Sequence, residues 1–95
     1  MTETIIYVVE GSTGEYSDNR NWAVCAYRDE DEAKAHVERA ERRAAEIFAT
    51  CAGDYWAWRS KMFRDEERPM NEHDPAMDLD YTGTHYTYYP VKLYE

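Results

Sequence analysis

The sequence predicts a single α+β domain over residues 1–95, with the element order β-β-α-α-β. Two observations predict this class. A β-branched and aromatic run lies near the N-terminus, and apolar residues recur at spacings of three and four in the middle of the chain. A length of 95 residues is that of one domain. We therefore expect a three-stranded, mostly antiparallel sheet covered by helices on one face.

The first strand is expected at Thr4–Val9. Both of its faces are almost entirely apolar, which is typical of a central strand. Residues 10–21 are rich in turn-forming side chains and predict a long loop. The second strand is expected at Trp22–Tyr27, antiparallel to the first. Strict alternation along it would place Trp22, Val24 and Ala26 on one face, and Ala23, Cys25 and Tyr27 on the other.

The segment Asp29–Cys51 predicts an amphipathic helix. Asp29 and Glu32 have the spacing of a capping box, and Gly53 is suited to end the helix. One face carries small and apolar residues, which allows a close approach to the sheet. We expect this face to form the core, with Val37, Ala40, Ala44, Ile47 and Phe48 packed on Ile6, Val8, Val24 and Leu93.

A second helix is expected over residues 55–67, with Asp54 as its cap and an unusually wide aromatic surface. Residues 68–83 predict irregular structure, because Pro69 and Pro75 exclude a continuous helix. The aromatic residues of these segments fit two uses: an exposed partner surface, or the filling of a core that is short of leucine.

The last strand is expected at Thr84–Tyr94. Pro90 cannot donate a ladder hydrogen bond, so this strand should lie at an edge of the sheet or be bulged at the proline. A right-handed crossover through the helices would make it parallel to the second strand. The predicted strand order is therefore 2-1-3, with the first strand in the centre.

The charge of the chain bears on its partners. Twenty acidic residues stand against 11 basic ones, a formal net charge of −9. Such a chain is repelled by phosphates unless it has a local basic patch, so we expect no direct binding of nucleic acid. The charge favours a protein partner with a basic surface, although it also serves solubility alone. The apolar runs are too short to span a membrane, and two cysteines without a CxxC motif are typical of reduced thiols in the cytoplasm.

No motif in the sequence carries recognisable chemistry. Residues 11–14, GSTG, lack the lysine and the following helix of a phosphate-binding loop. The acidic residues 72–80 do not have the spacing of a calcium loop. A Cys/His or Ser/His pair has no local signature, although such pairs meet in space rather than in sequence. We predict no catalytic, cofactor-binding or metal-binding residues and no enzymatic activity.

Partner-binding residues are expected in and around the irregular segment, where the core fixes the backbone least. Carboxylates there would accelerate association with a basic partner, and aromatic side chains would lengthen its residence. The predicted partner-binding residues are Trp56, Glu72, Asp74, Asp78, Asp80, Tyr81 and Tyr88.

Residues 6–18, IYVVEGSTGEYSD, the helix that follows them, and residues 80–84, DYTGT, resemble small acidic proteins encoded by phages and prophages. That group includes inhibitors of host defence such as anti-CRISPR proteins. The resemblance implies a compact α+β protein in the cytoplasm of a host bacterium, without a cofactor, that inhibits a defence or nucleic-acid-handling complex.

Two alternatives stay open from the sequence. The first is a small-ligand-binding or metal-binding protein, or an enzyme, that uses the loops at 11–21 and 71–83. The second is a self-associating module, in which the edge strand Thr84–Tyr94 pairs with a second copy to form a homodimer.

Overall fold

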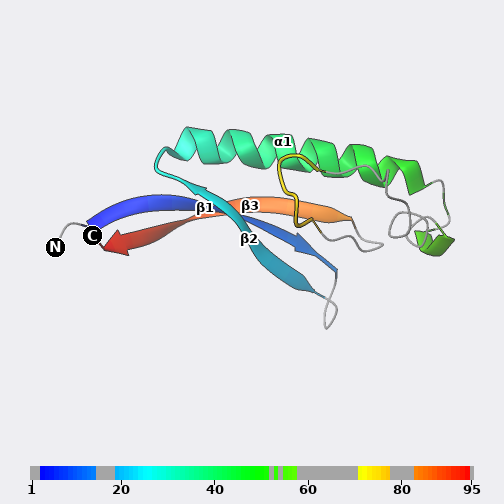
Figure 1. Ribbon diagram of the computed structural model, residues 1–95, viewed down its shortest axis with the longest axis horizontal. Coiled ribbons are helices and arrows are strands. Elements are labelled where there is room, and N and C mark those ends of the chain that lie inside the picture. Colours follow the sequence, from blue (N-terminus) through cyan, green and yellow to red (C-terminus); the bar gives the residue numbers. More distant parts are fainter. Residues whose placement is uncertain are drawn as a thin grey trace.

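The computed structural model confirms the α+β class and the three-stranded sheet (Figure 1). The strand order is β2-β1-β3, as predicted, and both outer strands run antiparallel to the central one. The outer strands are therefore parallel to each other. The structure describes residues 3–14, 19–51, 53, 55–57, 71–77 and 83–94.

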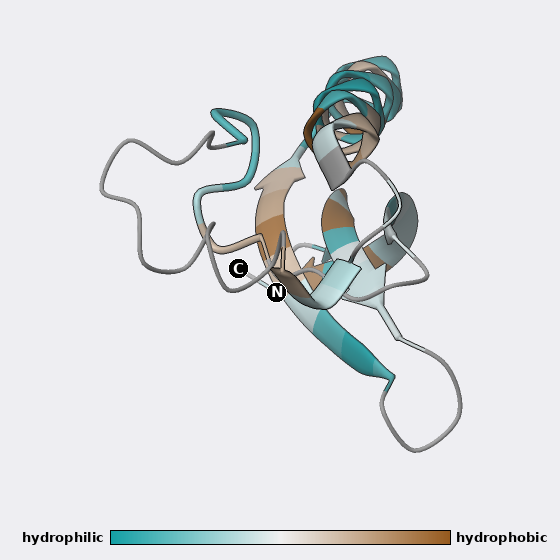
Figure 2. Cartoon of the chain, turned by 90° about the vertical axis from the view of Figure 1, so that its right-hand side faces the viewer, coloured by the Kyte–Doolittle hydropathy of each residue, from teal (hydrophilic) through white to brown (hydrophobic). Residues whose placement is uncertain are grey.

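The long helix lies over one face of the sheet, and β1 and β3 extend past its N-terminal end (Figure 1). Figure 2 views the same two layers along the sheet. The elements in chain order are β1 (Glu3–Thr13), β2 (Arg20–Tyr27), α1 (Glu30–Phe48), the short 3₁₀ helix η2 (Ala49–Cys51) and β3 (Thr84–Tyr94).

The first two strands are longer than the sequence predicts. β1 continues to Thr13, which pairs with Arg20 of β2 on one side and with Thr84 of β3 on the other. The prediction of a loop over 10–21 is therefore wrong at both of its ends. Pairing on both sides satisfies the backbone of the central strand, and this outweighs the turn preference of its glycine and serine residues.

A β-bulge changes the faces of β2. The register shifts between Val9 and Glu10, so that Val9 pairs with Cys25 while Glu10 pairs with Ala23, and Val24 is the extra residue. The prediction of strict alternation is wrong for this reason. The more exposed positions after Asn21 are Ala23 and Ala26, and the side chains that turn inward are Trp22, Val24, Cys25 and Tyr27.

The helix begins as predicted. Asp29 is the N-cap, and its Oδ1 accepts a hydrogen bond of 2.8 Å from the backbone N–H of Asp31. The regular helix ends at Phe48, earlier than expected, and continues as η2 before Gly53, whose φ of 88° is left-handed. Of the helix predicted over 55–67, residues 55–57 are helical and the rest lies outside the described residues.

The core lies between α1 and one face of the sheet. The predicted helix positions Ala40, Ala44 and Ile47 are buried, but their main partners are Tyr86 and Met77. Of the predicted sheet partners, Val24 packs on this cluster. The other three, Ile6, Val8 and Leu93, alternate with buried Val9 and Tyr86 and so share the opposite face.

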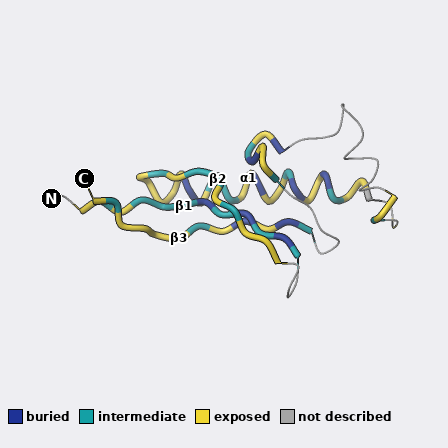
Figure 3. Tube along the Cα trace, turned by 60° about the horizontal axis from the view of Figure 1, so that its bottom comes forward, coloured by how far each residue is buried: buried dark blue, intermediate teal, exposed yellow. Residues whose placement is uncertain are grey.

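β3 is an edge strand, as Pro90 predicts. The backbone N–H of Tyr86 donates to Oε1 of Glu41 at 2.9 Å, so it points away from β1. In a strand, the backbone N–H groups of residues an even number of positions apart point to the same side. Position 90 therefore faces the outer edge as position 86 does, and the N–H that proline lacks there removes no hydrogen bond from the sheet. Much of β3 is exposed (Figure 3).

Candidate partner-binding surface

Residues 71–77 form a tight segment that packs against α1 and the sheet. Two backbone hydrogen bonds of 3.0 Å, from Asp74 N–H to the Asn71 carbonyl and from Met77 N–H to the Asp74 carbonyl, close consecutive turns. The Asn71 side chain is buried and donates to the carbonyl of Ala40 on α1 at 3.0 Å. The segment is therefore fixed to the helix by its own polar groups.

Asp74 is the centre of this segment. Its side chain is buried, at 1% exposure, and Oδ2 accepts from Trp22 Nε1 at 2.8 Å and from the Tyr86 hydroxyl at 2.7 Å. Oδ1 accepts from the N–H of Ala76 at 3.3 Å. Burial, followed by the hydrogen bond to Asp74, raises the pKa of Tyr86 well above its usual value. Asp74 is thus part of the core, which corrects its predicted place on a partner-binding surface.

A second, part-buried contact brings Cys25 close to His36. The carbonyl of His73 can only accept, so His36 Nε2 donates to it at 2.6 Å. In the neutral ring, Nδ1 then accepts from the Tyr27 hydroxyl at 2.8 Å. The Cys25 sulfur lies 3.8 Å from both nitrogens, and burial raises the pKa of its thiol. Because both nitrogens are already hydrogen-bonded, the arrangement suits a structural contact rather than an activated nucleophile.

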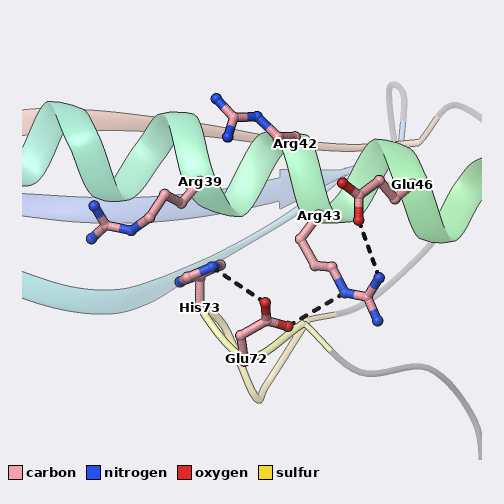
Figure 4. Close-up of a pocket in the computed structure, with 6 residues that line it drawn as sticks. All are labelled: Arg39, Arg42, Arg43, Glu46, Glu72 and His73. Atoms are coloured by element: carbon pink, nitrogen blue, oxygen red, sulfur yellow. Dashed lines mark hydrogen bonds and ion pairs between the residues drawn. The ribbon is translucent and has the colours of Figure 1, made fainter.

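A shallow cleft of about 230 Å³ lies where α1 meets the 71–77 segment (Figure 4). Glu72 sits between Arg43 Nε, at 3.4 Å, and His73 Nε2, also at 3.4 Å. Arg43 also pairs with Glu46 at 3.2 Å. In Figure 4, Arg42 points away from this group, so the arginines do not converge on one point. The residues that line the cleft are Arg39, Arg42, Arg43, Glu46, Glu72 and His73.

Two predicted partner-binding residues are exposed and lie near the same end of α1. Trp56 is 72% exposed, and its ring stacks edge-on to Tyr55 with centroids 5.2 Å apart. Tyr55 packs on Ile47, as does Met77 of the 71–77 segment, which carries exposed Glu72. We refer to the residues that line the cleft, Glu72 among them, as the α1 C-terminal surface; Trp56 does not line it. The sequence did not point to its three arginines, Arg39, Arg42 and Arg43, because their pattern on the helix is that of an ordinary solvent-exposed face.

Four other predicted partner-binding residues are not among the described residues of this surface. Tyr88 is half-buried, and its ring packs edge-on against Tyr7 with centroids 6.3 Å apart. Asp78, Asp80 and Tyr81 lie outside the described residues. The clearest run of exposed carboxylates is instead at the start of α1, at Asp29, Glu30, Asp31 and Glu32.

The described residues also bear on two other kinds of feature, a metal site and a membrane span. Among those residues, no three His, Cys, Asp or Glu side chains are placed to hold a metal ion. Within the same residues, no helix has both the length and the apolar character needed to cross a membrane.

No protein family, curated protein or solved structure matches this chain.

Proposed function

We propose that the protein acts by binding another protein that presents a basic surface. In this proposal it inhibits a bacterial defence or nucleic-acid-handling complex, as the resemblance to phage-encoded proteins implies. The observation that carries the binding proposal is the exposure of Trp56, at 72%, in a chain that also presents a cleft of charged side chains along α1. A tryptophan held in solvent leaves a large apolar area uncovered, and tryptophan is strongly enriched at the energetic centres of interfaces.

The charge of the chain supports a basic partner. The net charge is −9, and exposed carboxylates lie at both ends of α1, in Asp29–Glu32 and at Glu46 and Glu72. Opposite charge on a partner accelerates encounter, and a surface that binds nucleic acid is rich in lysine and arginine. The arginines of the cleft would lie at the rim of the contact, where paired charges contribute specificity more than affinity.

Binding of a protein is favoured over chemistry on a small substrate. The buried polar groups of the 71–77 segment are engaged within the fold: Asn71 with Ala40, and Asp74 with Trp22 and Tyr86. Groups that are buried and paired in this way position the backbone and are not presented to a ligand.

The proposal is tested by affinity capture from bacterial lysate with three forms of the protein: wild type, Trp56→Ala and Tyr94→Ala. Tyr94 is a matched control, because it is also an exposed aromatic residue, at 60%, and lies at the far end of β3. We expect a partner that the wild type and Tyr94→Ala retain, and that Trp56→Ala loses. Equal retention by all three would rule out Trp56 as the anchor.

A kinetic measurement on that partner tests the charge argument. Exchange of Glu72, Asp78 and Asp80 for amides should slow association and flatten its dependence on salt, while leaving dissociation nearly unchanged. The control is the same measurement on Glu3→Gln, which changes an exposed carboxylate on β1. Identical salt dependence in both variants would remove the irregular segment from the binding surface.

A further inference from the structure

We propose that the protein forms a homodimer by packing the face of its sheet that α1 does not cover onto the same face of a second copy. We call this the open face. Its apolar side chains come from all three strands, and they are Ile6, Val8, Ala23, Ala26, Tyr89, Val91 and Leu93.

The strand register places these residues together. Ile6 pairs with Val91, and Val8 pairs with Tyr89 on one side and with Ala26 on the other. Directly paired residues share a face of the sheet, so the set is contiguous across β2, β1 and β3. Tyr89 and Val91 are 39% and 37% exposed. Face-to-face packing of two such sheets, about 10 Å apart, is the arrangement of β-sandwiches.

The distribution of charge selects a second copy as the occupant. Within the described strands, Glu10 is the one charged residue on the open face. By strand alternation, Glu3, Arg20 and Lys92 belong to the opposite face, which α1 covers in part. Two chains of net charge −9 repel each other, and they can approach most closely through a surface that carries little charge. In a two-fold dimer of this kind the acidic helices lie on the two outer sides, as far apart as the assembly permits.

The edge of β3 is a poor alternative for self-association. Glu41 already occupies the outward N–H of Tyr86, and Pro90 lacks the N–H that a pairing strand would need. A charged side chain across the edge and a proline within it are common ways of blocking strand addition. Self-association is therefore expected through the face of the sheet and not through its edge.

The area of the open face suits a weak, specific dimer. At about 3.3 Å per residue and about 4.8 Å between strands, the sheet covers about 500 Å² per copy. The total of about 1,000 Å² reaches the lower limit for a specific interface. Among the described residues, the buried apolar side chains on the helix side are few, namely Val9, Ala33, Ala40, Ala44, Ile47 and Tyr86. Covering the open face would therefore add substantially to the apolar area that the fold removes from water.

Sedimentation equilibrium on the full chain tests the proposal, over concentrations from about 1 μM to about 1 mM. The expected result is a mass that rises with concentration from 11.3 kDa towards twice that value. Added salt should leave the dimer intact or strengthen it, because salt screens repulsion between like charges. A monomer throughout this range would overturn the proposal.

A matched pair of variants locates the interface. Val91 and Ile5 are 37% and 38% exposed on opposite faces of the sheet. Val91→Glu should weaken the dimer by about tenfold or more, while Ile5→Glu should leave it unchanged. Tyr89→Lys is a second test of the open face if Val91→Glu does not fold, as judged by circular dichroism. Equal effects of Val91→Glu and Ile5→Glu would contradict the assignment.

A third variant distinguishes the face from the edge. Lys92 is six residues after Tyr86, so its backbone N–H also points away from β1, to the outer edge of the sheet. Lys92→Pro removes that donor without altering the open face. We expect Lys92→Pro to dimerise as the wild type does. Loss of the dimer in Lys92→Pro alone would show pairing through the edge of β3 and would overturn the proposal.

Discussion

The Tyr86 hydroxyl donates a 2.7 Å hydrogen bond to Asp74, and so joins β3 to the 71–77 segment inside the domain. The same carboxylate oxygen accepts from the indole of Trp22 on β2. One buried oxygen therefore connects the two outer strands of the sheet to a segment without regular structure. A carboxylate tolerates burial when donors surround it in this way, and its removal leaves those donors without an acceptor.

We predict that Asp74→Ala lowers the free energy of unfolding by about 2–4 kcal/mol, because the Trp22 indole N–H and the buried Tyr86 hydroxyl would each lose their acceptor. Urea denaturation followed by circular dichroism measures the change. Glu72→Ala is the control, since Glu72 is exposed and two residues away, and it should change stability by less than about 0.5 kcal/mol. Similar losses in the two variants would contradict the central role of Asp74.

A second prediction concerns alkaline pH. Burial and the hydrogen bond to Asp74 raise the pKa of Tyr86, so above its ordinary value of 10.0 the unfolded chain ionises this tyrosine while the folded chain keeps it protonated. The unfolded state then binds fewer protons. The stability due to this group is fully present below about pH 10 and is lost as pH rises further, by up to about 1.4 kcal/mol per pH unit.

Urea denaturation at a series of pH values from 9 upward measures this slope. In Tyr86→Phe the decline above about pH 10 should be shallower than in the wild type, because the shifted group is gone. Tyr89→Phe changes an exposed tyrosine and should retain the wild-type slope. An unchanged slope in Tyr86→Phe would show that other groups cause the alkaline loss.

Local patterns predict much of the fold. The β-branched run of β1, the stripe of α1 with Asp29 as its cap, and Pro90 as the mark of an edge strand all act within a few residues of chain. The bulge opposite Val9 was missed because it depends on the pairing of two strands. Its consequence, that Trp22 and Val24 turn to the same side as Cys25 and Tyr27, could not be read from alternation alone.

The candidate site was less predictable than the fold. In the sequence, Asp74 is one acidic residue among several in an irregular stretch, and the sequence contains no sign that it is buried. Its burial depends on Trp22, 52 residues earlier, and on Tyr86, 12 residues later. Trp56 is exposed, as a partner-binding residue must be, but an exposed side chain of this kind identifies no partner by itself.

The core gives a third prediction. Ile47 is fully buried, whereas Phe48 is half-buried, so Ile47→Ala should be the more damaging of two adjacent substitutions. We expect a loss of about 2–5 kcal/mol for Ile47→Ala, since the cavity would lie between α1, Tyr55 and Met77. Thermal and urea denaturation of the two variants provide the comparison. A larger loss in Phe48→Ala would place the core-facing stripe of α1 one position further along the helix.

The last prediction concerns Gly11 in the central strand. A Cβ atom at this position would lie 2.6 Å from Cε2 of the Trp22 indole, which is far too close. The indole cannot move aside readily, because its N–H is bonded to buried Asp74. Gly11→Ala should therefore lower the free energy of unfolding by about 1–3 kcal/mol. Its backbone is not in the left-handed region, so alanine would otherwise be tolerated or even favoured in a strand.

A double-mutant cycle with Trp22→Leu isolates this contact. Leucine is smaller than the indole, so Gly11→Ala should cost less in the Trp22→Leu background, with a coupling energy of about 1 kcal/mol or more. Gly83→Ala is a useful contrast, because no atom lies within 4 Å of its added Cβ while its φ of 85° is left-handed. Its cost would arise from the backbone and should be the same with Trp22 or Leu at position 22. Equal costs of Gly11→Ala in both backgrounds would mean that the indole does not set the requirement for glycine.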